Sequence, residues 1–118
     1  MQERRRSPRI SHKISLTVKA DSFDLVTESL NISSSGVYCQ TDTRIPAMTK
    51  VNILLVLPDK SKLRCKGVIV RCEKSQKPPD KFNTAIFFNE ISSRDSEYLL
   101  SYIQGHLAPL VRYPRGAS

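Results

Sequence analysis

The chain has 118 residues, of which 39% are hydrophobic and 25% charged, so it fits one globular domain with a buried core and not a disordered chain. No segment approaches the roughly 20 apolar residues of a membrane span, and the N-terminus is basic where a secretory signal is apolar, so we expect no membrane span and a cytoplasmic location. The formal net charge of +8 favours an anionic partner such as a nucleotide, a nucleic acid or an acidic lipid.

The first residues, MQERRRSPRI, carry much of this charge. Residues 1–13 hold five cationic side chains and one carboxylate, a net of +4 and half of the total excess. Pro8 lacks an N–H group and favours an extended conformation in the residue before it, which disfavours a helix through this segment. We therefore predict a flexible basic arm over residues 1–13.

Short apolar segments bounded by turn-forming residues follow the arm. In the clearest of them, Ile14, Leu16 and Val18 alternate with polar residues, as in a strand with one buried face. The predicted strands are 14–20, 24–33, 36–41, 51–57, 62–73 and 82–91. No helices alternate with these strands, so the pattern indicates a mainly β protein with an antiparallel barrel or sandwich.

One helix is predicted after the last strand. Ser92 or Ser93 can cap its N-terminus, and Leu99, Ile103 and Leu107 recur at four-residue spacing to form an apolar stripe. The folded domain is thus expected over residues 14–107, with a frayed tail over 108–118.

No catalytic or metal-binding pattern appears in the sequence. His12 and His106 have no partners at metal-ligand spacing, and no phosphate-binding glycine motif is present. Cys39, Cys65 and Cys72 form no C-x-x-C pair and are expected to be reduced thiols. We expect a protein that is not an enzyme and holds no metal or cofactor.

Two short motifs stand out. Arg5 and Arg9 form R-x-x-x-R before the first predicted strand, and Asn31, Ser33 and Gly36 form N-x-S-x-x-G between the second and third. Taken separately, the first fits a solvated tail and the second an ordinary turn in which the glycine supplies a positive φ. Their joint occurrence in this order is a much more specific signal.

Together the motifs resemble those of the PilZ family, bacterial receptor domains for cyclic di-GMP, over roughly residues 3–107. The segment GVIVR around Gly67 also resembles a later barrel strand of that family. The resemblance implies a six-stranded antiparallel split β-barrel with a C-terminal α-helix. It also implies a receptor in which the arm orders over the bound nucleotide.

By this resemblance, Arg5 and Arg9 bind phosphate or guanine through their planar guanidinium groups. Asn31 and Ser33 read guanine edges, and Gly36 lets the backbone approach the ligand.

The residue before R-x-x-x-R is Arg4. Family members with a basic residue there tend to hold two stacked cyclic di-GMP molecules, so Arg4 is assigned to a second ligand. The output, whether motility, exopolysaccharide or biofilm formation, requires a protein partner that the sequence does not identify.

Two other functions are kept as alternatives. A PilZ-like domain that binds no nucleotide can serve as a protein-interaction scaffold. A small basic barrel can also bind single-stranded nucleic acid without specificity, but such proteins stack bases on exposed aromatic rings. The chain has no Trp, and we expect Phe82, Phe87 and Phe88 to be in the core, so no specific nucleic acid is expected.

Overall fold

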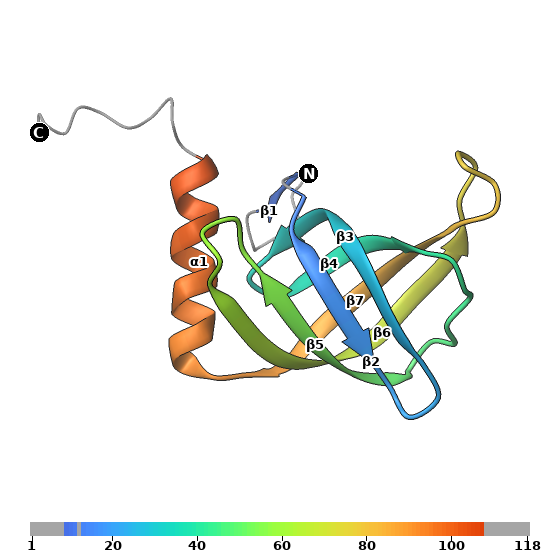
Figure 1. Ribbon diagram of the computed structural model, residues 1–118, viewed down its shortest axis with the longest axis horizontal. Helices are drawn as coiled ribbons and strands as arrows, with labels where there is room; N and C mark the ends of the chain where they lie inside the picture. The colour runs from blue at the N-terminus through green and yellow to red at the C-terminus, as the bar shows by residue number, and fades with distance from the viewer. Residues whose placement is uncertain (1–8, 12, 108–118) are drawn as a thin grey trace, which may run out of the picture.

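The strands form a closed antiparallel barrel (Figure 1). The alternating apolar side chains are buried inside it. The computed structural model describes residues 9–11 and 13–107. Its elements in chain order are β1 (Arg9–Ile10), β2 (Ser15–Lys19), β3 (Asp24–Ser33), β4 (Gly36–Thr41), β5 (Lys50–Val56), β6 (Lys62–Lys74), β7 (Phe82–Ile91) and α1 (Ser93–Leu107). The six predicted strands correspond to β2–β7, with bounds that differ by one residue at most.

Six of the strands close the barrel. Their order is β3-β2-β5-β6-β7-β4, all neighbours pair antiparallel, and β4 pairs back onto β3. The predicted mainly β fold, a six-stranded antiparallel barrel with a C-terminal helix, is confirmed. Closure also leaves β3 and β4 paired with each other, which brings the two ends of the N-x-S-x-x-G motif together.

The core is one apolar cluster inside the barrel and beneath the helix. Val51, Ile53, Leu55 and Leu57 are all buried, as their alternation predicts. Beyond Leu57, the chain turns through a residue of positive φ, Lys60, whose N–H group donates to the Leu57 carbonyl at 2.8 Å. The predicted hairpin between β5 and β6 is therefore present.

The two-residue strand β1 was not expected. It pairs with β3, in the register Arg9 with Ser33 and Ile10 with Ile32. Ile10 is buried in the core cluster, and this burial fixes the end of the predicted arm to the barrel. Residues 1–8, His12 and 108–118 lie outside the described residues, as do the side chains of Arg9, His106 and Leu107.

The helix α1 begins at the predicted cap and packs at one end of the barrel (Figure 1). The Ser92 hydroxyl accepts the Asp95 N–H at 3.1 Å, and the Asp95 carboxylate accepts the Arg64 N–H of β6 at 3.1 Å. Leu99 and Ile103 are fully buried. Within the described part of the chain, no helix is long and apolar enough to cross a bilayer.

A hydrogen-bond cluster fastens the β5–β6 hairpin to α1. The Tyr98 hydroxyl donates to the Asp59 carboxylate at 2.6 Å and lies 2.8 Å from the Ser61 hydroxyl. The bond from Tyr98, followed by hydrogen bonds from the N–H and hydroxyl of Ser61, holds the pKa of the Asp59 carboxyl below its ordinary value. The free end of the hairpin is therefore held against the helix.

Candidate functional site

The N-x-S-x-x-G motif lines a shallow hollow of about 250 Å³ on the outside of the barrel. Its walls come from the end of β3, the start of β4 and the middle of β6 and β7. The lining includes the side chains of Asn31, Ser33, Tyr38, Val70, Arg71 and Phe87, with the backbone of Gly36.

An irregularity in β3 brings the motif into this position. The β3–β4 register shifts between Ser29 and Asn31, after which Asn31 is opposite Tyr38. Such a bulge leaves one residue unpaired and bends the strand. Asn31 is half-buried and Tyr38 beside it is also half-buried, so both keep an open side toward the hollow.

The Ser33 hydroxyl organises the turn between β3 and β4. It accepts the Ser35 N–H at 3.1 Å, lies 3.1 Å from the Ser35 hydroxyl, and is 3.5 Å from the Gly36 carbonyl. Ser33 is 3% exposed. This is a local side-chain turn of the kind that Ser favours, so Ser33 shapes the hollow in addition to lining it.

Gly36 is required by the close approach of two strands. No glycine among the described residues has a positive φ, so the alternative in which Gly36 supplies one is wrong. A Cβ atom at this position would lie 2.4 Å from the Ile86 carbonyl oxygen on β7. The missing side chain therefore allows β4 and β7 to pair at the edge of the hollow.

The R-x-x-x-R motif reaches the same place through β1. Arg9 is the register partner of Ser33, so the last arginine of one motif is directly opposite the central serine of the other. Arg4 and Arg5 lie outside the described residues. The structure thus joins Arg9, Asn31, Ser33 and Gly36 at one edge of the barrel.

Several side chains of this hollow were missed by sequence reasoning. Among them, Tyr38 comes from β4, Val70 and Arg71 come from β6, and Phe87 comes from β7. Phe87 was expected in the core but is 48% exposed, whereas Phe88 is 6% exposed and does lie in the core. Strict alternation through Ile86, Phe87 and Phe88 turns the middle residue outward, and this was the available signal.

Arg71 adds a cation to the hollow. The β6–β7 register shifts between Ile69 and Arg71, so Val70 is the extra residue of a bulge beside the site. The Arg71 side chain is 59% exposed, and its Nε lies 3.9 Å from the Glu73 carboxylate. An exposed guanidinium can bind a phosphate through paired hydrogen bonds or stack on a purine.

The described residues offer no metal site and few nucleophiles. They contain no group of three or more His, Cys, Asp or Glu side chains that could hold a metal ion. Burial raises the pKa of the Cys39 and Cys65 thiols to about 12. Both thiols are therefore protonated at neutral pH, and neither lines this hollow.

One family model matches most of the chain. The family model described as PilZ domain matches residues 3–105. A search of curated proteins gives no match.

Solved structures share the fold at low identity. The Bacillus subtilis inhibitor of motility (MotI/DgrA) has a TM-score of 0.84 at 20% identity, over 94% of this chain and 55% of that one. The K. pneumonia MrkH–c-di-GMP complex has a TM-score of 0.73 at 14% identity, over 87% of this chain and 52% of that one. The PilZ domain with c-di-GMP of YcgR from Escherichia coli has a TM-score of 0.67 at 16% identity, over 87% of this chain and 91% of that one. The chain spans about half the length of the first two.

Proposed function

This chain belongs to the PilZ domain family, and we propose that it is a cyclic di-GMP receptor domain without catalytic activity. The observation that carries the proposal is the β1–β3 register, which places Arg9 opposite Ser33 at the edge of the hollow. This register supports a single site built from two motifs that are separate in the sequence. Two of the similar structures, those of MrkH and YcgR, contain c-di-GMP.

The cationic part of the proposed site comes from Arg5, Arg9 and Arg71. A guanidinium fork can form paired hydrogen bonds to a phosphate or to guanine O6 and N7, which lysine cannot reproduce. Arg71 supports this assignment because it is exposed and lines the hollow. We assign Arg5 and Arg9 to the two phosphates and neighbouring guanine edges, and Arg71 to a guanine face.

The polar part comes from β3. The Asn31 amide can accept from guanine N–H donors. Ser33 acts mainly by holding the turn that shapes this wall, because its hydroxyl accepts the Ser35 N–H. Phe87 and Val70 add an apolar surface against which a purine ring can pack.

The size of the hollow indicates how the ligand is held. At about 250 Å³, it is smaller than the roughly 300 Å³ at which enclosed small-molecule sites begin. The nucleotide must therefore rest partly outside the hollow and needs contacts from another segment. We assign these contacts to the arm, which loses conformational freedom on binding and so acts as an order switch.

Several finer features belong to the same proposal. Arg4 holds a second, stacked cyclic di-GMP molecule, and no cofactor takes part. The domain acts in the cytoplasm and passes the signal to a protein partner that controls motility, exopolysaccharide or biofilm formation. The similarity to an inhibitor of motility favours the first of these outputs.

Parallel calorimetric titrations with cyclic di-GMP, GMP and a short single-stranded RNA test the proposal. We expect cyclic di-GMP to bind with a micromolar Kd or tighter, about −8 kcal/mol, because several arginine forks and polar groups converge on it. GMP, which offers one phosphate and one guanine, should bind far more weakly. Binding of RNA without binding of the dinucleotide would favour a nucleic-acid-binding barrel, and no binding of any of the three would favour a scaffold.

A further inference from the structure

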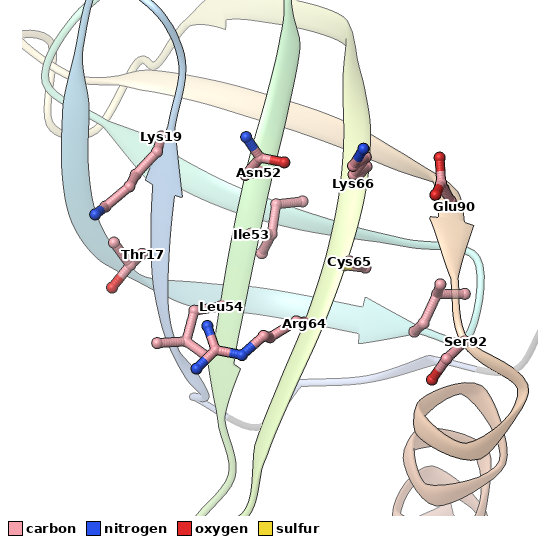
Figure 2. Close-up of a pocket in the computed structure, with 11 residues that line it drawn as sticks. Thr17, Lys19, Asn52, Ile53, Leu54, Arg64, Cys65, Lys66, Glu90 and Ser92 are labelled. Atoms are coloured by element: carbon pink, nitrogen blue, oxygen red, sulfur yellow. The ribbon is translucent and has the colours of Figure 1, made fainter.

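A second hollow, of about 630 Å³, lies on a different part of the barrel surface, over β2, β5, β6 and the end of β7 (Figure 2). Its residues form two rows across the strands. Lys19 pairs with Asn52, Asn52 with Lys66, and Lys66 with Glu90. In the next row, Thr17 and Arg64 are both opposite Leu54.

The surface of this hollow is basic. A neighbouring hollow of about 460 Å³ shares Lys19 and Lys66 and adds Lys50. We call Lys19, Lys50, Arg64 and Lys66 the basic face. All four are exposed, and within the described part of the chain none has a carboxylate oxygen within 4.0 Å. Their charges are therefore available to an outside partner.

Apolar side chains lie among these charges. Leu54 and Ile91 are half-buried and line the hollow. In Figure 2, the guanidinium of Arg64 lies beside Leu54, with Lys19 and Lys66 on either side of β5 above them. An occupant that matches this surface needs carboxylates around an apolar group.

The same features argue against the other available occupants. The basic face has no aromatic side chain on which the bases of a nucleic acid could stack. The two ends of this chain are excluded by charge. Residues 1–8 carry three arginines and one glutamate, and residues 108–118 carry two arginines and no acidic side chain.

We propose that the basic face docks an acidic, leucine-containing segment of a partner protein. Long-range attraction between this face and carboxylates would speed encounter and make binding weaken with salt. Leu54 and Ile91 would supply the apolar contact that a simple polyanion cannot use. The face is made by β2, β5 and β6, apart from the motif hollow, so docking does not require the nucleotide.

The test uses the full chain and a fluorescent synthetic peptide of Glu and Leu, with the leucines on one helical face, followed by anisotropy. A matched pair of double variants isolates the face. Arg64→Gln with Lys66→Gln removes two cations from it, whereas Arg44→Gln with Lys77→Gln removes two exposed cations that line neither basic hollow. Melting curves confirm that both variants fold.

We expect the first double variant to raise the peptide Kd about tenfold and the second to leave it nearly unchanged. A version of the peptide with Ser in place of Leu should also bind more weakly. Equal loss in both double variants would overturn the proposal, as would tighter binding of an oligothymidylate at the same face. The titration is repeated with and without cyclic di-GMP, so failure of nucleotide binding would not be confused with failure of docking.

Discussion

Arg9 on β1 and Ser33 on β3 are antiparallel register partners at the edge of the motif hollow. The pairing is made by the backbone, and burial of Ile10 in the neighbouring position supports it. Substitution of the Arg9 side chain should therefore leave the strand pairing in place. This separates the contribution of Arg9 to binding from its contribution to the fold.

Arg9→Ala should raise the Kd for cyclic di-GMP by about 5- to 150-fold. This corresponds to about 1–3 kcal/mol for the loss of one bidentate contact. Arg94→Ala is the matched control, because Arg94 is exposed on α1 and lines no part of the hollow. Calorimetry on both variants measures the difference. Equal, small effects would mean that diffuse positive charge, and not the motif, attracts the ligand.

Gly36→Ala should destabilise the barrel by roughly 1–3 kcal/mol, as overpacking does. The new Cβ atom would lie 2.4 Å from the Ile86 carbonyl oxygen, so β4 and β7 would have to move apart. Gly105→Ala is the control, because Gly105 is on the exposed surface of α1 with nothing within 4 Å of such a Cβ atom. Gly105→Ala should raise the free energy of unfolding by up to about 1 kcal/mol, because Ala has a higher helix propensity than Gly. Urea unfolding of both variants measures these changes. A Gly36→Ala variant as stable as the parent chain would contradict the explanation.

Ser33→Ala should lower both stability and affinity. Its hydroxyl is buried and accepts the Ser35 N–H, so the substitution costs about 1 kcal/mol of unfolding free energy and loosens the wall of the hollow. Ser35→Ala leaves that N–H bonded and should cost less. Thermal melting and cyclic di-GMP titration of both variants check this. Loss of affinity without any loss of stability would instead make Ser33 a direct ligand contact.

The sequence predicts the six strands and the helix because their signals are local. Alternation of Val51, Ile53, Leu55 and Leu57 specifies which face is buried, and Ser92 with Asp95 specifies where the helix begins. Strand β1 carries no such signal, since two residues show no period. It is specified by pairing with β3, a contact between distant parts of the chain.

The site is predictable to the extent that its residues belong to a motif. Asn31, Ser33 and Gly36 are found this way, but the reason for Gly36 is its approach to Ile86, which spacing does not reveal. Phe87 is missed because it was placed in the core, although alternation with its neighbours turns it outward. Arg71 is missed because the bulge at Val70 shifts the register of β6 against β7. A register shift of this kind depends on packing of the whole barrel.

The cysteines should differ in reactivity in the folded protein. Burial raises the pKa of Cys39 and Cys65 to about 12, so at pH 8 about one thiol in ten thousand is ionised, whereas Cys72 is half-buried. Iodoacetamide should therefore label Cys72 first, and all three only in urea. Peptide mass mapping over time measures the rates. Labelling of Cys39 in the native protein at its unfolded rate would show that this part of the barrel opens readily.

The last prediction concerns Arg4, the residue before R-x-x-x-R. Two stacked cyclic di-GMP molecules bring four phosphate charges and an additional guanine face. A further guanidinium can neutralise part of the phosphate charge and stack on the guanine face. The motif hollow of about 250 Å³ cannot enclose such a pair, so the second molecule would depend on the arm. We expect the parent chain to bind two ligands and Arg4→Leu to bind one, with Arg6→Leu as the control that keeps two. Calorimetric stoichiometry decides this. A ratio of one for the parent chain, at concentrations where the free nucleotide dimerises, would remove Arg4 from this role and leave Arg5 and Arg9 as the working pair.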